Sequence, residues 1–349
     1  MIQIENFSVD LGEFHLREIS LTIKDGEYMV LLGPTGAGKT VLVECLVGIH
    51  RPKAGRILID GQDVTSLYPE ERNVGYVPQD YALFPNMTVA ENLAYGLKAR
   101  RRPKAEIAAT VEAMMDLLGI AHLRHRLPLN LSGGEKQRGA LGRALVTKPH
   151  ILLLDEPLAA LDENFRSELA AEIRHIQRTL GGTFLHVCHS LEETADVADR
   201  VALLHEGRLV QVGTVEQLLS RPANLFVAQF TRTRNFLEGF AERTSSGCGI
   251  RLANGLTLKS DDGNVEGAVT VAIRPEDIEI LRNGDPLPSS ECMRAAIVEV
   301  RERPTHAEIE LDAGVPLVAY ARRGSGAPRV GDIVFARVPS RAVRVFRQH

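Results

Sequence analysis

Hydrophobic positions divide the chain into two parts with different periodicity. Between residues 1 and 230, short continuous apolar runs such as YMVLLG (28–33) and HILLLD (150–155) are separated by stretches whose apolar residues recur every three or four positions. Continuous runs bounded by turn residues are typical of strands covered on both faces, and the longer spacing is typical of amphipathic helices. The pattern therefore predicts an α/β domain with a parallel sheet over residues 1–230.

A mostly helical stretch, from about residue 89 to residue 147, separates these two runs. Thr88 is placed to cap the helix that begins in TVAENLAYGL, and AEIAATVEAMMDLLGI (105–120) keeps the helical spacing. We expect a helical sub-domain here. The N-terminal MIQIENFSVDLGEF alternates as a strand does and lacks the charged and apolar regions of a signal peptide.

From about residue 235 the spacing of the hydrophobic residues changes. Short alternating runs such as GIRLANGLTLKS, AVTVAIRPEDIEIL and DIVFARV are punctuated by Gly, Pro, Asn and Asp. This pattern is typical of a small all-β barrel or sandwich. We therefore predict a second, all-β domain over residues 235–349.

Composition narrows the class of protein. The 349 residues carry a formal net charge of -4, which gives no electrostatic case for nucleic acid as a partner. No apolar run approaches the roughly 18 residues of a membrane helix, so we expect a cytoplasmic chain that meets a membrane only through partners. Cys45, Cys188, Cys248 and Cys292 are widely spaced, which argues against a metal site or disulfide framework. We expect Cys45 and Cys188 to be buried thiols.

The segment GPTGAGKT (33–40) carries the first chemical signal, because it matches G-x-x-x-x-G-K-[ST] between a predicted strand and a predicted helix. The candidate phosphate-binding residues are Gly33, Pro34, Thr35, Gly36, Ala37, Gly38, Lys39 and Thr40. The glycines let backbone N–H groups point at phosphate oxygens, Lys39 reaches the β and γ phosphates, and Thr40 offers a hydroxyl to Mg²⁺. The plain alternative is a glycine-rich turn that only joins strand to helix.

The segment ILLLDEP supplies a pair of acids at a strand end. Asp155 ends an apolar run, where a carboxylate is costly unless it meets a cation or hydrogen bonds. Mg²⁺ would satisfy it. Glu156 follows directly and is placed to orient and deprotonate an attacking water. Taken alone, the pair is also compatible with solvated acids at a strand end.

The segment LSGGEKQR (131–138) begins a second helix with unusual residues. Ser132 and Glu135 form the S-x-x-E pattern of a capping box. Gly133 and Gly134 weaken the first turn but leave bare N–H groups at the positive end of the helix dipole, which suits an anion. Gly139 and Gly142 weaken the same helix further, for which we expect close packing as the reason.

These three segments together resemble the nucleotide-binding subunits of ATP-binding-cassette (ABC) transporters, in which LSGGEKQR is the signature sequence. The resemblance spans nearly the whole chain and implies a RecA-like P-loop fold. It also implies a homodimer in which two copies dock head to tail. Ser132 and Gly134 of one copy then contact the ATP that the other copy holds, with ATP and Mg²⁺ as the cofactors.

The resemblance extends to single residues elsewhere. Gln79 matches the glutamine that links the metal site to the helical sub-domain, and LAALD matches the D-loop, which ends at Asp162. His189 matches the switch histidine that touches the γ-phosphate, although Ser190 follows it where Asp is usual. Phe14 is the candidate for stacking on adenine, with a place in the core as the alternative.

Within the family the chain resembles importer subunits. Residues 235–349, with NFLEG and AIRPEDIEI, are similar to the small oligomer-binding-type barrel that such importers append to the ATPase domain. There NMTVAENLAYGL and the Gln79 region form a groove for a short helix of an integral-membrane permease, which in turn works with a substrate-binding protein. The chain would then lie at the cytoplasmic face of the membrane. LGPTGAGKT and DAGVPLVAYARR are most similar to molybdate/tungstate importers, and the resemblance suggests Ser289, Ser290 and Arg294 as an oxyanion site. A barrel loop without a ligand is the alternative.

The sequence does not determine which solute is imported, because the permease and the substrate-binding protein select it. Sulfate, phosphate, iron, polyamine and sugar importers are the alternatives to molybdate or tungstate. ABC-type ATPases of DNA repair carry long coiled coils that this chain lacks, and those of translation usually carry two cassettes. A P-loop kinase has no use for LSGGEKQR.

Overall fold

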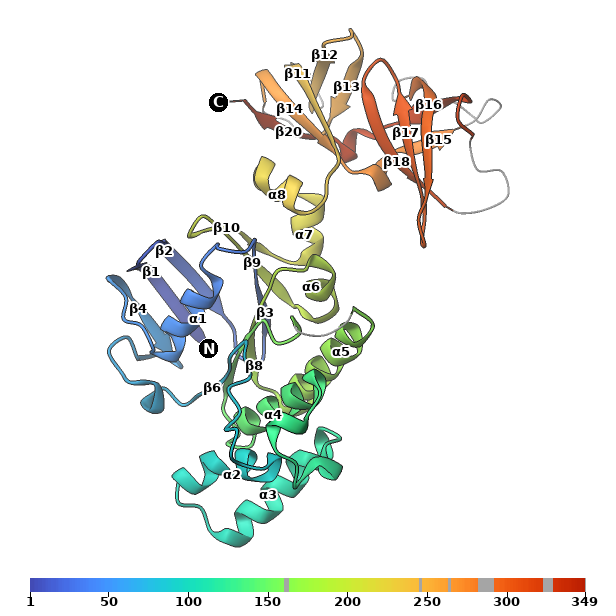
Figure 1. The fold of residues 1–349 in the computed structure, drawn as a ribbon. Coiled ribbons are helices and arrows are strands. Elements are labelled where there is room, and N and C mark those ends of the chain that lie inside the picture. Colours follow the sequence, from blue (N-terminus) through green and yellow to red (C-terminus); the bar gives the residue numbers. More distant parts are fainter. Residues whose placement is uncertain (160–162, 245–246, 263–264, 282–291, 323–328, 349) are drawn as a thin grey trace. The chain divides into compact units, whose positions relative to one another are not determined.

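A computed structural model describes the chain except residues 160–162, 245–246, 263–264, 282–291, 323–328 and 349 (Figure 1). Its contacts divide it into two compact units, Met1–Val215 and Glu216–His349. The sequence pattern places the boundary later, after residue 230, and two short helices lie between the two positions. They are α7 (Val215–Ser220) and α8 (Leu225–Phe230).

A six-stranded sheet forms the centre of the first unit, in the order β10-β9-β3-β8-β7-β6. Its strands are β3 (Tyr28–Leu32), β6 (Val74–Val77), β7 (Ile151–Asp155), β8 (Thr183–Cys188), β9 (Arg200–His205) and β10 (Arg208–Gly213). All neighbours run parallel except β10, which is antiparallel to β9. Every residue of β3, β7 and β8 is buried, which confirms the prediction from the continuous apolar runs.

A second, antiparallel sheet has the order β2-β1-β4-β5. It comprises β1 (Ile2–Leu11), β2 (Phe14–Ile23), β4 (Ala54–Ile59) and β5 (Gln62–Asp63). Helix α1 (Lys39–Val47) shares one buried core with both sheets, represented by Phe7, Leu42 and Leu153. The helix that follows GPTGAGKT is therefore fixed by apolar packing on two sides (Figure 1).

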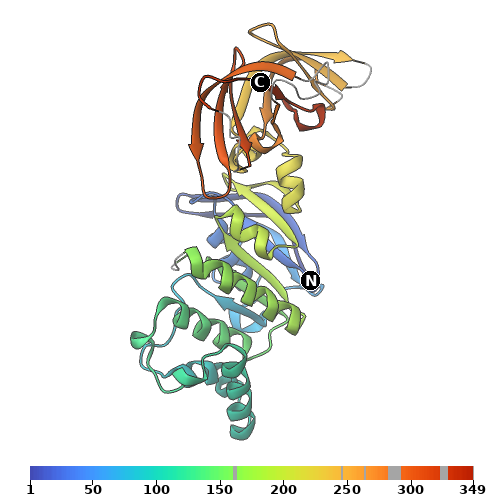
Figure 2. The same cartoon turned by 90° about the vertical axis from the view of Figure 1, so that its right-hand side faces the viewer.

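The helical sub-domain contains α2 (Val89–Ala99), α3 (Lys104–Leu117) and α4 (Gly133–Leu145), and it lies at one end of the unit (Figure 2). Thr88 caps α2 by accepting a hydrogen bond from the Glu91 amide, as predicted. Gly142 has a packing reason, since a Cβ there would lie 2.8 Å from Leu118 Cδ1. The remaining helices of this unit are α5 (Glu163–Leu180) and α6 (Leu191–Val197).

The second unit is an antiparallel β domain of two five-stranded sheets, ordered β13-β12-β11-β14-β20 and β15-β19-β16-β17-β18. The strands are β11 (Asn235–Thr244), β12 (Gly247–Leu252), β13 (Thr257–Ser260), β14 (Gly267–Ile273), β15 (Glu279–Leu281), β16 (Cys292–Glu302), β17 (Ala307–Asp312), β18 (Pro316–Ala321), β19 (Ile333–Arg337) and β20 (Arg344–Arg347). Residues of both sheets share one core, for example Ile250 and Ile309. In the described residues, no helix is both long and apolar enough to span a bilayer.

Candidate active site

Four adjacent parallel strands end at one edge of the central sheet, and each delivers a predicted site residue there. Gly33 follows β3, His189 follows β8, and Asp155 ends β7. Gln79 lies shortly after β6. Ligands of parallel α/β sheets bind at such carboxyl edges, because loops from neighbouring strands converge there. The sheet order therefore collects residues that are far apart in sequence.

The phosphate loop connects β3 to α1 through left-handed backbone. Gly36 has φ of 82° and Gly38, the N-cap of α1, has φ of 96°. A Cβ at Gly38 would lie 2.7 Å from Leu16 Cδ2, so the site demands glycine for space as well as for conformation. No side chain caps α1. Its first N–H groups are consequently available to an anion.

Lys39 holds its ammonium inside the loop. The side chain is 5% exposed, and Nζ donates to the carbonyl oxygens of Gly33 and Pro34, both at 3.0 Å. Nζ also lies 4.0 Å from Glu156 Oε1. Burial lowers the pKa of Lys39, and the charge of Glu156 opposes that shift. The cation thus sits where a phosphate in the loop would meet it.

Thr40 and Asp155 form the part of the site that fits a divalent cation. Thr40 Oγ1 donates to Asp155 Oδ1 at 3.1 Å. Asp155 is only 2% exposed, and burial raises its pKa to about 6 against the lowering effect of the Thr40 hydrogen bond. A buried carboxylate beside a hydroxyl is an oxygen donor set that suits Mg²⁺, and bound positive charge would relieve the cost of burying the acid.

Glu156 lies at the centre of the cluster. Its carboxylate accepts a 3.5 Å hydrogen bond from Gln79 Nε2 and lies 3.9 Å from His189 Nδ1. Its backbone has φ of 45°, an uncommon conformation outside glycine, and its amide donates to Val187 O at 3.1 Å. Strain held in this way is typical of functional sites. Here it turns the Glu156 side chain toward the ends of the neighbouring strands.

The signature segment forms the capping box that the sequence predicts. Ser132 is the N-cap of α4, its amide donates to Glu135 Oε2 at 2.7 Å, and the Glu135 amide donates to Ser132 Oγ at 3.4 Å. Gly133 and Gly134 open the helix. Within the described chain, no hydrogen bond joins this segment to the phosphate loop, and α4 lies apart from α1 (Figure 1). One copy of the chain does not bring the two motifs together.

Phe14 opens β2 with 45% of its surface exposed and therefore lies outside the core. Leu16, on the same face of the strand, is the residue that packs against Gly38. Asp162, Ser289 and Ser290 lie outside the described residues. Arg294 is exposed on β16.

The second unit holds a cavity of about 350 Å³ whose lining includes three arginines and three acidic residues. They are Arg274, Arg341, Arg344, Glu276, Asp277 and Glu279. Arg294 is not part of this lining.

Sequence reasoning missed the residues that fix the segment after Gln79. Asn92 of α2 is fully buried, accepts the Phe84 amide at 2.8 Å, and donates to Phe84 O at 3.2 Å. Arg143 of α4 donates to the carbonyl oxygens of Tyr81 and Ala82 and lies over the Phe84 ring. A buried asparagine amid the apolar positions of α2 was the available signal. Together these contacts attach residues 79–84, which we call the Gln79 segment, to the helical sub-domain.

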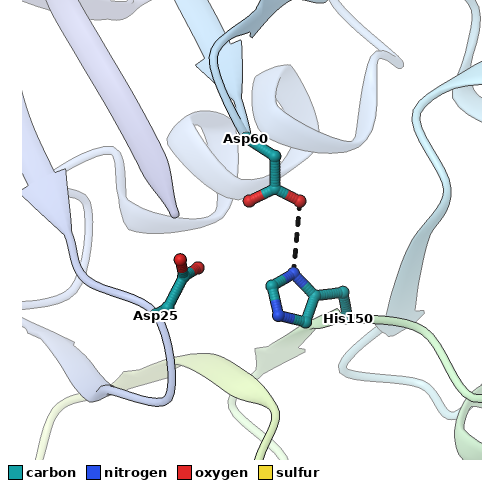
Figure 3. A group of neighbouring side chains, drawn as sticks. All are labelled: Asp25, Asp60 and His150. Carbon is teal, nitrogen blue, oxygen red and sulfur yellow. Dashed lines mark hydrogen bonds and ion pairs between the residues drawn. The ribbon is translucent and has the colours of Figure 1, made fainter.

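A second cluster lies elsewhere in the first unit, where Asp25, Asp60 and His150 come together from three separate loops (Figure 3). His150 Nδ1 lies 3.2 Å from Asp60 Oδ2. All three residues are exposed, and both carboxylates accept hydrogen bonds from the amino group of Met1. The ammonium and imidazole already satisfy the acids, so we assign no metal to this cluster.

The phosphate loop at the end of β3, the buried acid of β7 and the carboxylate beside them define a P-loop ATPase site on a parallel sheet. Comparison with known proteins narrows this class. Residues 16–159 match the family model described as ABC transporter. Import ATP-binding proteins of this family match nearly the full length of the chain at 40% identity or more, so the chain belongs to the ATP-binding proteins of ABC importers and is an ATPase.

Individual relatives cover the whole chain. A molybdate/tungstate import ATP-binding protein, WtpC, from Pyrococcus horikoshii is 42% identical over 99% of this chain and 100% of its own. A sulfate/thiosulfate import ATP-binding protein from Chromobacterium violaceum is 40% identical over 99% of this chain and 97% of its own. Among solved structures, a dimeric post-hydrolysis state of the ATP-binding cassette MJ0796, bound to ADP and Pi, matches with a TM-score of 0.56 and 26% identity. It covers 62% of this chain and 99% of that one.

Proposed function

We propose that this chain is the ATP-hydrolysing subunit of a molybdate or tungstate importer. The observation that carries the proposal is the full-length likeness to the molybdate/tungstate import protein, which includes the second unit as well as the ATPase unit. Hydrolysis itself is the task of the cluster around Glu156.

ATP would bind with its phosphates in the loop between β3 and α1. The N–H groups at the start of α1 face the phosphate oxygens, and Lys39 moves its ammonium from the loop carbonyls to the β and γ phosphates. Phe14 stacks on the adenine at the exposed side of the loop, a place supported by the packing of its neighbour Leu16 on Gly38.

Thr40 and Asp155 would hold Mg²⁺, with Gln79 contributing from the neighbouring strand end. When bound, the cation neutralises charge on the phosphate oxygens. Asp155 needs such a partner because it is buried as an acid. Gln79 would link the cation site to the helical sub-domain, because Asn92 of α2 and Arg143 of α4 bind the residues that follow it.

Glu156 accepts a proton from the attacking water while the water oxygen bonds to the γ-phosphorus. The bond between that phosphorus and the β–γ bridging oxygen breaks, and ADP and phosphate are the products. His189 contacts the γ-phosphate and keeps the water and Glu156 in line. The 3.9 Å separation of His189 Nδ1 from the Glu156 carboxylate supports this division of roles.

Two copies would complete the site by docking head to tail. Ser132 and Gly134 lie at the start of a helix whose N–H groups suit an anion, yet the amide and hydroxyl of Ser132 form hydrogen bonds with Glu135 of the same helix, and helix α4 lies apart from α1. In a homodimer they reach the ATP held by the partner. Loss of phosphate removes negative charge from the interface, so the dimer opens after hydrolysis and closes when ATP binds.

A permease would dock beside the Gln79 segment, and this contact would hold the chain at the cytoplasmic face of the membrane. Tyr95 is 46% exposed and its ring centroid lies 4.5 Å from that of Phe84. The exposed Tyr95 ring and the half-buried Phe84 ring, with Phe84 held by Asn92 and Arg143, offer an apolar surface close in sequence to Gln79. A substrate-binding protein delivers the solute to the permease.

The second unit would serve as an accessory, regulatory β domain. We propose Ser289, Ser290 and Arg294 as its oxyanion site, because hydroxyls and a guanidinium are suitable donors for molybdate. Calorimetric titration of the full chain with molybdate and with tungstate tests this site. Unchanged heats after Ser289→Ala together with Arg294→Ala would refute it.

The importer proposal is tested in the complex of this chain with its permease and binding protein. We expect molybdate and tungstate to stimulate ATP hydrolysis, and sulfate to leave it at the basal rate. Stimulation by sulfate alone would favour a sulfate importer, the second candidate, which the 40% identical sulfate/thiosulfate relative supports. Loss of all turnover in Glu156→Gln verifies that this chain hydrolyses the ATP.

A further inference from the structure

Three buried polar side chains, Tyr28, His186 and Glu193, form a network close to the switch histidine in the sequence. His186 of β8 is fully buried, and its Nδ1 lies 2.9 Å from the hydroxyl of Tyr28. Its Nε2 lies 2.8 Å from Glu193 Oε1, and only 9% of the Glu193 side chain is exposed. Three polar groups buried at one place are costly unless each satisfies another. The nucleotide chemistry described above uses none of them.

Tyr28 and Glu193 approach different ring nitrogens of His186. Burial raises the pKa of the Tyr28 phenol well above its usual range, so the hydroxyl keeps its proton. When that hydroxyl donates to Nδ1, the neutral imidazole carries its own proton on Nε2, which faces Glu193. At 2.8 Å this approach is close, but it is not aligned as a hydrogen bond. A small shift of α6 would align Glu193 with His186 Nε2 for a hydrogen bond.

In the sequence, His189 lies between strand β8 and helix α6, the two elements that the His186–Glu193 contact joins. His186 and Cys188 point from the same face of β8, and both contact α6, which begins directly after the switch residue. The Cys188 thiol donates to Ser190 O at 3.1 Å and lies 3.2 Å from Thr194 Oγ1. The backbone of His189 is thus held from the strand before it and from the helix after it.

The same polar network includes a residue of β3, the strand that leads into the phosphate loop. Tyr28 opens β3, the strand that ends at Gly33. Its amide donates to Asp199 Oδ2 at 2.8 Å, and the Arg174 guanidinium of α5 lies 5.4 Å from its ring centroid. Tyr28 is therefore fixed on both sides, and the network connects a rigid strand to the shorter helix α6.

We propose that Tyr28, His186 and Glu193 are positioning residues for His189, which set α6 against β3 and β8 and so hold the switch imidazole beside Glu156. The inference rests on the proposed contact of His189 with the γ-phosphate. It makes the position of the His189 side chain depend on buried polar contacts on the face of β8 opposite Leu185 and Val187.

Steady-state ATP hydrolysis by the full chain tests the proposal in a double-mutant cycle. We expect Glu193→Ala and His186→Phe each to lower kcat by about tenfold with little change in KM, because misplacement of a catalytic group costs transition-state stabilisation. In a His189→Ala background, the same changes should produce no further loss, since they act through His189. Glu193→Gln, which keeps the shape and an oxygen acceptor facing His186 Nε2, should recover most of kcat.

Two controls keep the outcomes distinct. Asp196→Ala removes an exposed carboxylate from the same helix and should leave kcat unchanged. Tyr28→Phe deletes one hydroxyl, so it remains informative if Glu193→Ala fails to fold, and it should lower kcat only when His189 is present. Equal losses with and without His189 would overturn the positioning role and leave the proposed function intact. Full activity of His189→Ala alone would overturn the catalytic role of His189 and with it the positioning role, while ATP hydrolysis by this chain would stand.

Discussion

The hydroxyl of Thr40 donates a 3.1 Å hydrogen bond to the carboxylate of Asp155, across 115 positions of the sequence. The contact joins the end of the phosphate loop to the end of β7, with β8 between the two strands. It brings two oxygen ligands together at a site where the acid is buried. The order of the strands, which places β8 between β3 and β7, thus creates the place where we propose that Mg²⁺ binds.

Replacing Asp155 by Asn separates the function of this site from its stability. We expect Mg²⁺-dependent turnover to fall by about a hundredfold, because the neutral amide is a poor partner for the cation. The thermal midpoint without nucleotide should not fall, since a neutral group is cheaper to bury and still accepts from Thr40. Turnover assays and thermal unfolding measure the two effects. Asp116→Asn, an exposed change on α3, is the control, and unchanged turnover in Asp155→Asn would contradict the assignment.

Glu156→Gln should nearly abolish turnover and trap an ATP-bound dimer. The amide keeps the shape of the side chain but cannot accept the water proton, so the closed state persists. Phosphate release measures the first effect, and light scattering after gel filtration with ATP measures the second. Glu168→Gln, an exposed change on α5, should alter neither. A purely monomeric Glu156→Gln protein with ATP would contradict the prediction.

Ser132→Arg should stop turnover while the isolated subunit binds nucleotide almost normally, because we propose that Ser132 acts on the ATP of the partner. Fluorescent-nucleotide titration and phosphate release measure the two quantities. A large loss of affinity in the monomer would argue against action across the dimer.

Mixing Ser132→Arg subunits with Lys39→Ala subunits sharpens this test. Each mixed dimer has one site built from an intact loop and an intact signature, so activity should return although neither variant is active alone. If mixed dimers form and remain inactive, the head-to-tail arrangement is wrong.

Acid should destabilise the fold partly through Asp199. Burial acts to raise the pKa of this carboxyl, but the hydrogen bonds from Arg174 and the Tyr28 amide outweigh it, and the pKa lies below its ordinary value. An acid with a lowered folded pKa stabilises the fold above its unfolded pKa of about 3.9 and loses that contribution as pH falls through the folded value. Urea unfolding between pH 2 and pH 7 should therefore show a shallower acid loss in Asp199→Asn than in the natural chain. Asp196→Asn, exposed on α6, should keep the natural slope.

Two glycines of α4 should respond oppositely to alanine. At Gly142 a new Cβ would lie 2.8 Å from Leu118 Cδ1 and 3.1 Å from Leu93 Cδ2, both of buried leucines, so we expect a loss of about 1–3 kcal/mol. At Gly139 the nearest atom, Leu83 Cδ1, is 3.6 Å away, so the helix propensity of alanine should stabilise by up to about 1 kcal/mol. Denaturant unfolding measures both. Equal effects would show that packing does not distinguish the two positions.

Local signals were sufficient for much of the fold. Continuous apolar runs predicted β3 and β7, and the S-x-x-E pattern predicted the start of α4, because a strand between two layers or a helix cap requires particular residues at particular spacings. The phosphate loop was predictable for the same reason, since glycine permits backbone that other residues avoid.

What the sequence determined by itself was the chemistry that each segment carries and the type of element that presents it. The tertiary structure alone decided which segments meet. Sheet order brought Thr40 to Asp155 and His189 to Glu156, packing explained Gly142, and folding buried His186 against Tyr28 and Glu193. The reason is physical, because periodicity and capping are encoded within a few neighbouring residues, whereas pairing across the sheet depends on how the whole chain buries its apolar surface.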